Sequence, residues 1–264
     1  MGARVASVEK ALKILDLLAN EHQGLRVSDI AKAVSVPYTT AYRLISTLED
    51  AGYIHSIPDT RRYTLSLKIL HLYRGLNRRL NLNQVCFPHM LQLMERVGET
   101  VHLAVLDDGE VVYVNSVLSP RSPAMYTEVG KRAPVHCTAL GKALTAYLPA
   151  EAVRSILRRK GMEARTGNTL REPGEFLAEL RWVRQRGYAV DNEESELGVR
   201  CVASTVVNFL GEVVAAVSVS APVGRMPLEK IPEVAKRVVE TCDAISTHLG
   251  ASPAQIELYR EHAE

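Results

Sequence analysis

Hydrophobic positions recur with a helical period in three short segments of the first 52 residues. In the first segment they lie three and four residues apart, which predicts an amphipathic helix buried along Val8, Leu12, Leu15 and Ala19. The second segment, residues 28–34, predicts a short helix that Ser28 caps and that packs through its apolar positions. A turn of two residues leads into the third segment.

The third segment opens at Pro37, ends before Gly52 and has two opposed faces. Its apolar face consists of Ala41, Leu44, Ile45 and Leu48. The polar face has the same spacing shifted back by two residues, about 200° around a helix, and consists of Thr39, Tyr42, Arg43 and Ser46. One face therefore packs, while the other presents hydrogen-bond donors, a ring and a guanidinium.

A hairpin follows the third helix. Residues 53–57 and 61–65 have strand-like composition and flank the turn sequence Pro58-Asp59-Thr60. Helix, short helix, tight turn, polar-faced helix and hairpin is the order of a winged helix-turn-helix. We expect this DNA-binding domain to occupy residues 1–65.

The polar face of the third helix has the chemistry of a DNA reader. In a helix-turn-helix the N-terminal residues of this helix enter the major groove, where Arg43 would pair with guanine. The expected DNA contacts are Tyr38, Thr39, Thr40, Tyr42 and Arg43 on the helix and Arg61 and Arg62 on the hairpin. Each feature alone also fits a solvated surface, and it is their ordered combination that favours DNA.

Charge is unevenly distributed along the chain. The 264 residues carry a net charge of +2, but residues 1–80 hold twelve Lys and Arg against seven Asp and Glu, which leaves the remainder acidic. A basic front of this kind favours a nucleic-acid partner. No apolar run reaches the roughly 18 residues of a membrane span, and no signal-peptide pattern is present, so we expect a cytoplasmic protein without a membrane partner.

The pattern changes after residue 66. Residues 66–85 predict a linker or dimerisation helix with an apolar stripe, although an ordinary surface helix fits equally well; the stripe is Ile69, Leu72, Tyr73, Leu76 and Leu80. Farther on, hairpins at residues 101–117 and 200–220 alternate with helices at residues 138–148, 150–160, 173–187 and 228–249. We therefore expect an α+β domain over residues 86–264, with helices flanking an antiparallel sheet.

Two polar features of this second domain suggest a ligand. Thr138 is placed to cap a helix, which would leave the N–H groups of Ala139, Leu140 and Gly141 facing an anion. A capped helix without any ligand fits the same residues. Ser218 and Ser220 lie two apart on a predicted strand and so share one face, either toward a ligand or toward water.

Other chemistries find less support. Cys86, Cys137, Cys201 and Cys242 include no CxxC pair, which argues against a zinc module. His136 and Cys137 with Asp191 resemble a hydrolase set, but neighbours in an extended segment point in opposite directions. No Walker A, HExxH or GxSxG motif is present. We expect no enzyme, no cofactor and no metal; a redox or metal sensor and a ligand-free architectural protein are the alternatives.

Five segments resemble the IclR family of bacterial transcriptional regulators: "SVEKALKILDLLA", "VSDIAKAVSVPYTTAYRLISTLEDAGYI", "PDTRRYTLSLKIL", "GKRAPVHCTALGKALTAYLP" and "GYAVDNEESELGVRCVASTVVNFLGEVVAAVSVSAP". The resemblance runs in order over nearly the whole chain. It implies an N-terminal winged helix-turn-helix, a connecting helix and a C-terminal GAF-like effector-binding domain. It also implies a homodimer or homotetramer that binds a near-palindromic double-stranded DNA operator.

The resemblance further implies an effector site. The matching positions are Ala139, Leu140, Asp191, Cys201, Ser218 and Ser220. We expect the backbone at Ala139–Leu140 and the serines to hold the carboxylate of a small organic acid. Asp191 would accept a hydrogen bond from a ligand hydroxyl, and Cys201 would be a weak donor at the wall. The protein is thus expected to be an effector-responsive transcriptional regulator, of a catabolic pathway.

Overall fold

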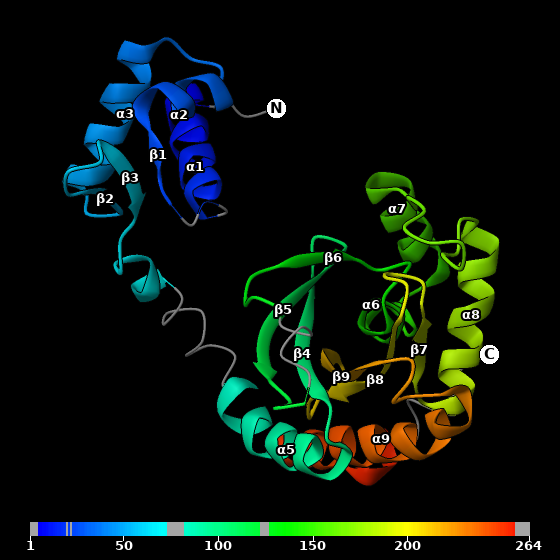
Figure 1. Ribbon diagram of the computed structural model, residues 1–264. Helices are drawn as coiled ribbons and strands as arrows, with labels where there is room; N and C mark the ends of the chain where they lie inside the picture. Colours follow the sequence, from blue (N-terminus) through cyan, green and yellow to red (C-terminus); the bar gives the residue numbers. More distant parts are fainter. Residues whose placement is uncertain (1–4, 20, 22, 73–81, 122–126, 257–264) are drawn as a thin grey trace. The chain divides into compact units, whose positions relative to one another are not determined.

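The chain forms two compact units, Met1–Leu80 and Asn81–Glu264. Figure 1 shows the computed structural model, which describes residues 5–19, 21, 23–72, 82–121 and 127–256. In the described part of the chain, no helix is long and apolar enough to cross a membrane.

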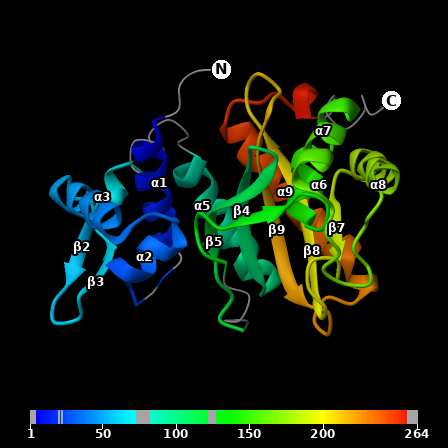
Figure 2. The ribbon, with the colours of Figure 1, turned by 90° about the horizontal axis from the view of Figure 1, so that it is seen from above.

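The first unit is a winged helix-turn-helix, as predicted. Its elements are α1 (Ala6–Ala19), β1 (Leu25–Arg26), α2 (Val27–Ala33), α3 (Tyr38–Asp50), β2 (Ile54–Ile57) and β3 (Arg62–Leu65). The strands form an antiparallel sheet in the order β1-β3-β2. The β2–β3 hairpin extends beyond the three helices, which pack around a core containing Ile14, Ile30 and Ile45 (Figure 2).

Two local predictions for this unit are wrong. Val8 and Leu12 are 55% and 56% exposed, whereas Ile14 and Leu18 form the buried face of α1. Apolar side chains cover more than one stripe of this helix, so periodicity alone does not identify the face that packs. Ser28 does not cap α2, because the helix already begins at Val27 and no side chain caps it.

The boundary between the units differs from the expected one. A short helical turn covers residues 69–72, while Tyr73, Leu76 and Leu80 of the expected linker helix lie outside the described residues. Helix α5 (Leu82–Val97) follows, so a boundary between residues 85 and 86 falls inside a helix. Its buried side chains pack in the core of the second unit.

The second unit is built on one antiparallel sheet of six strands in the order β6-β5-β4-β9-β8-β7. The strands are β4 (Thr100–Asp107), β5 (Glu110–Val117), β6 (Arg132–Pro134), β7 (Ala189–Asn192), β8 (Val199–Val207) and β9 (Val213–Pro222). The hairpins β4–β5 and β8–β9 are the two that the sequence predicted. They are joined in the centre of the sheet by pairing between β4 and β9.

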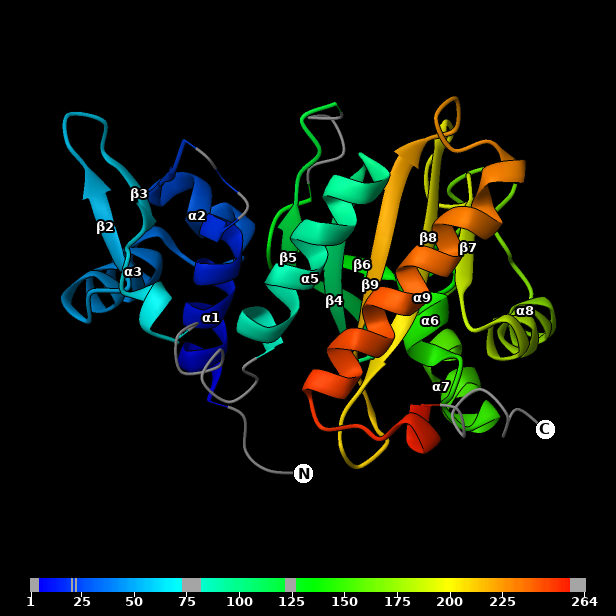
Figure 3. The same cartoon turned by 90° about the horizontal axis from the view of Figure 1, so that it is seen from below.

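Helices cover both faces of this sheet. The helices besides α5 are α6 (Ala139–Thr145), α7 (Ala150–Lys160), α8 (Pro173–Arg186), the 3-10 turn η2 (Leu228–Lys230) and α9 (Ile231–His248). Figure 3 shows α5 and α9 side by side on one face, while α6, α7 and α8 lie toward the other. Every residue of α6 is buried, and this short helix packs directly against the sheet.

Candidate functional site

Strand register brings together polar residues that are far apart in the sequence. Asp191 on β7 pairs with Cys201 on β8, which pairs with Ser220 on β9. Two residues along β9, Ser218 lies opposite His102 on β4. Because side chains two apart on a strand share a face, these residues form a polar patch on one side of the sheet.

A cavity of about 440 Å³ lies over this patch. All six expected effector-site residues line it: Ala139, Leu140, Asp191, Cys201, Ser218 and Ser220. The first two come from the start of α6, and the others come from β7, β8 and β9. The cavity therefore has a helix start on one side and the row of polar strand residues on the other. Met125 and Tyr126, which lie between β5 and β6 in the sequence and are candidates for packing or for shaping the cavity, fall outside the described residues.

The start of α6 offers fewer free donors than expected. Thr138 caps the helix, and its Oγ1 accepts the N–H of Gly141 at 3.1 Å. The backbone donors that remain for a ligand in this turn are those of Ala139 and Leu140. Gly141 has a packing role, because a Cβ atom there would overlap the backbone of Val135.

Asp191 is held by its own turn. Its Oδ1 accepts the backbone N–H groups of Glu194 at 2.8 Å and Ser195 at 3.3 Å. Only 3% of the residue is exposed, and this burial raises the pKa of Asp191 to about 7, although the backbone N–H of Glu194 acts in the opposite direction. The carboxyl group thus changes charge near neutral pH.

Next to Asp191, the thiol of Cys201 accepts a hydrogen bond from the Ser220 hydroxyl at 3.1 Å. Burial raises the pKa of this thiol, so it is uncharged at neutral pH. Cys201 therefore contributes a neutral, weakly polar surface to the cavity wall.

Sequence reasoning missed an aromatic part of the cavity. His102 and Tyr113 line it, with their rings edge to face and their centroids 5.4 Å apart. Burial lowers the pKa of His102 to about 4, so its imidazole is neutral, and its Nδ1 lies 2.8 Å from the hydroxyl of Ser116. Only the predicted alternation of β4, which puts His102 between apolar neighbours, could have drawn attention to it.

Cationic side chains also line the cavity and were not predicted. They are Lys131, Arg132 and Arg165, all exposed. Arg132 is paired with Asp107 and Glu110, whereas no ion pair of Lys131 or Arg165 occurs among the described residues. These two cations favour an anionic ligand.

The hydrolase arrangement is not formed. The imidazole of His136 lies 3.0 Å from the carbonyl oxygen of Glu163. Burial raises the pKa of the Cys137 thiol to about 11, so no thiolate is available as a nucleophile. Within the described ranges, no three His, Cys, Asp or Glu residues gather closely enough to hold a metal ion.

The first unit presents the expected polar face of α3. The five predicted helix residues, Tyr38, Thr39, Thr40, Tyr42 and Arg43, are all exposed. A groove beside this helix is lined by Tyr38 and Tyr42, by the hairpin around Arg61 and by two residues that sequence reasoning did not select, Arg26 and Ser28. Arg26 immediately precedes α2, and Ser28 lies in its first turn.

The two arginines of the wing differ. Arg61 is exposed in the turn, in a left-handed conformation with φ of 55°. The guanidinium of Arg62 donates from Nη1 to the carbonyl oxygen of Gly24 at 2.8 Å. Arg61 is thus free to contact DNA, while Arg62 also ties the wing to the loop before β1.

Known proteins share both units. Residues 7–58 match the IclR helix-turn-helix domain, and residues 76–247 match the bacterial transcriptional regulator IclR C-terminal domain. The HTH-type transcriptional regulator XynR of Escherichia coli K12 is 32% identical over 246 residues, which cover 93% of this chain and 98% of that protein.

Solved structures have the same fold. The crystal structure of the Thermotoga maritima IclR protein has a TM-score of 0.76 and 32% identity, covering 94% of this chain and 100% of that one. An IclR homologue from Microbacterium hydrocarbonoxydans, solved with 4-hydroxybenzoate, has a TM-score of 0.83 at 24% identity, covering 93% and 100%. This chain belongs to the IclR family of bacterial transcriptional regulators: it is a DNA-binding regulator with an effector-binding C-terminal domain, and not an enzyme.

Proposed function

We propose that the cavity over β7, β8 and β9 binds a small, polar organic acid and that this binding changes the affinity of the protein for its operator. The observation that carries the proposal is the convergence of a helix start, two serines and Asp191 on one cavity that Lys131 and Arg165 also line. An anion would find donors on several sides of this space.

Each part of the cavity has a role in the proposal. The backbone at Ala139 and Leu140, with Ser218 and Ser220, holds the carboxylate. Asp191 accepts a hydrogen bond from a hydroxyl of the ligand when it is ionised. No cofactor besides the effector is required by this reading.

We further propose that the regulator acts in the cytoplasm as a homodimer or homotetramer on a near-palindromic operator. An apolar stripe on α1 supports self-association, because Val8 and Leu12, four residues apart on one helical face, are more than half exposed, as is Val5 just before the helix. Side chains of this kind are commonly buried against a second copy. A two-fold dimer would present two α3 helices to two half-sites. Its relatives XynR, KdgR and AllR are named as transcriptional regulators or repressors. Their names support a regulatory role, and the proposed pathway under control is a catabolic one.

A thermal-shift screen of the full-length protein tests the effector proposal. The panel consists of glyoxylate, pyruvate, sugar acids and aromatic acids including 4-hydroxybenzoate. A ligand at 100 times its dissociation constant adds about 2.7 kcal/mol to the free energy of unfolding, so a cognate acid raises the melting temperature. Ser218→Ala should abolish that shift, while Thr247→Ala, on the exposed surface of α9, should retain it. Equal shifts in both variants would contradict the proposed site.

A further inference from the structure

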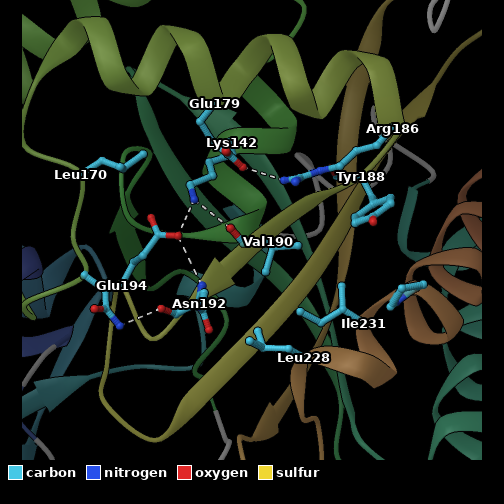
Figure 4. Close-up of a pocket in the computed structure, with 12 residues that line it drawn as sticks. Lys142, Leu170, Glu179, Arg186, Tyr188, Val190, Asn192, Glu194, Leu228 and Ile231 are labelled. Atoms are coloured by element: carbon cyan, nitrogen blue, oxygen red, sulfur yellow. Dashed lines mark hydrogen bonds and ion pairs between the residues drawn. The ribbon is translucent and has the colours of Figure 1, made fainter.

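A second cavity lies on the other side of the segment that carries Asp191. It has a volume of about 600 Å³ and contains Lys142 from α6 and Glu194 from the turn after β7. Figure 4 shows the Lys142 side chain reaching between Val190 and Glu194. Val190 and Glu194 stand on either side of Asp191 in the sequence, so Lys142 contacts the backbone segment that presents Asp191 to the first cavity.

These contacts are short and buried. The ammonium of Lys142 donates to Oε1 of Glu194 at 2.5 Å and to the carbonyl oxygen of Val190 at 2.8 Å. The side chains of Lys142 and Glu194 are only 2% and 9% exposed. Oε1 of Glu194 also accepts the backbone N–H of Asn192 at 3.3 Å. Lys142 and Glu194 therefore hold the strand before and the turn after Asp191.

Glu194 depends on this lysine. Its second oxygen, Oε2, is buried without a hydrogen-bond partner in the part of the chain that the structure describes. Burying a carboxylate with one oxygen unsatisfied is costly, and a nearby cation offsets that cost. The backbone N–H of the same residue donates to Asp191, so the placement of Glu194 and the placement of Asp191 are mechanically linked.

We propose that Lys142 and Glu194 are positioning residues for the effector site, which hold the carboxyl group of Asp191 in place and set its charge from outside the cavity. The inference rests on the proposed function, because it concerns the residue assigned to the ligand hydroxyl. In this proposal, a buried ion pair between two residues that are 52 positions apart in the sequence fixes the position of Asp191.

The surroundings of Asp191 determine what a test would measure. The charged groups that act on it are Glu194 on its own turn and Lys142 on α6, and the titratable groups that it influences are Tyr113 on β5, Cys137 before α6 and Cys201 on β8. Within this set, Lys142 lowers the pKa of Asp191 and Glu194 raises it. Removing Lys142 should therefore raise the pKa of Asp191, and removing the charge of Glu194 should lower it.

The experiment is a ¹³C NMR titration of the Asp191 carboxyl group in the full-length protein without ligand. Lys142→Met should raise the pKa of Asp191 above its wild-type value near 7, because the ammonium group that lowers this pKa is removed. Glu194→Gln should lower it. The double variant, which buries no unpaired charge, should return it toward the wild-type value, and it keeps the test decisive where Lys142→Met does not fold.

Arg186→Met is the matched control. Arg186 and Glu179 form another ion pair beside the same cavity, at 2.6 Å, and Arg186 also donates to the carbonyl oxygen of Tyr188 rather than to the segment around Asp191. This variant should leave the titration of Asp191 unchanged. A shift in the same direction in both single variants would show general loosening and overturn the inference, as would no shift in either. Because no ligand is used, a failed effector screen leaves this result intact, and the two proposals fail separately.

Discussion

The wing carries two adjacent arginines that the structure makes unequal. Arg61 is exposed at the turn, while Arg62 donates a hydrogen bond to the carbonyl oxygen of Gly24. Their surroundings differ because Arg61 lies in the turn with φ of 55°, whereas Arg62 is the first residue of β3. The sequence pair Arg-Arg does not show this difference, and only the tertiary contact with Gly24 reveals it.

This difference predicts separate effects for the two arginines. Arg61→Ala should weaken binding to all DNA sequences and lower the slope of affinity against salt by about 1, because a phosphate contact is lost. Arg62→Ala should also lower the free energy of unfolding by about 1 kcal/mol, because it removes a hydrogen bond within the unit. Operator titrations at several salt concentrations and thermal melts measure both. An unchanged salt slope in Arg61→Ala would remove this residue from the DNA interface.

Asp191 and His102 give the second unit opposed responses to pH. Asp191 has a folded pKa near 7 against an ordinary value of 3.8, so the folded protein holds a proton that the unfolded chain has released between these values. The stability contribution of Asp191 therefore falls as the pH rises, by up to about 4 kcal/mol. Burial lowers the pKa of His102 from 6.5 to about 4, so its contribution instead falls as the pH drops below about 6.5.

Because the two effects offset each other in the wild type, the contribution of Asp191 is best seen by difference. Asp191→Asn keeps an oxygen for the backbone N–H of Glu194 but cannot ionise. Relative to the wild type it should become progressively more stable between about pH 4 and pH 7, and the difference should level off above pH 7. Urea denaturation at a series of pH values gives this difference directly. A difference that stays constant with pH would show that Asp191 is already ionised throughout the range.

Helix α6 packs against the sheet and lines the cavity with its first residues, and this packing depends on one small residue. A Cβ atom at Gly141 would overlap the Cα and carbonyl oxygen of Val135, which are backbone atoms that cannot easily move. Gly141→Ala should therefore lower the free energy of unfolding by about 1–3 kcal/mol. Gly174→Ala is the matched control, because nothing lies within 4 Å of its Cβ position and it should change stability by less than about 0.5 kcal/mol. Chemical denaturation of both variants tests this; equal stability would show that α6 can shift freely.

Elements with a long local pattern could be predicted from the sequence. The opposed faces of α3 and the hairpin around Asp108-Gly109 rest on contacts between near neighbours, and the structure has both. Strand β7 has only four residues, with no periodicity to recognise, and it exists because β8 pairs with it. In α5 the buried positions keep a helical spacing across Pro88, but only the first residues of this helix fall within the helix expected over residues 66–85.

The cavity could be predicted only in part, because many of its residues meet through pairing between strands that are far apart in the sequence. Ser218 and Ser220 share a face by strand alternation, and the family resemblance supplied Asp191 and Cys201. The register that sets His102 opposite Ser218 joins strands more than 100 residues apart in the chain, and no local signal encodes it. The pairing of Lys142 with Glu194 is equally non-local. Sequence patterns thus identified single residues, while the sheet determined which of them meet.

At the scale of the whole molecule, the exposed stripe of α1 predicts self-association. Leu12→Glu replaces a side chain that is 56% exposed, so the isolated unit should still fold. A charge in an apolar contact between copies should lower the oligomeric mass seen by light scattering. Lys13→Glu, one residue along α1 and away from the stripe, is the control and should keep the wild-type mass. An unchanged mass in both variants would place the association surface elsewhere.

We propose above all that effector binding in the cavity and operator binding are linked by one coupling free energy. The most direct measurement is operator affinity by fluorescence anisotropy, with and without the acid that raises the melting temperature, together with the affinity for that acid with and without operator. We expect the acid to change operator affinity by some factor and the operator to change acid affinity by the same factor, with both effects lost in Ser218→Ala. An acid that binds the wild type but leaves operator affinity unchanged would contradict the account.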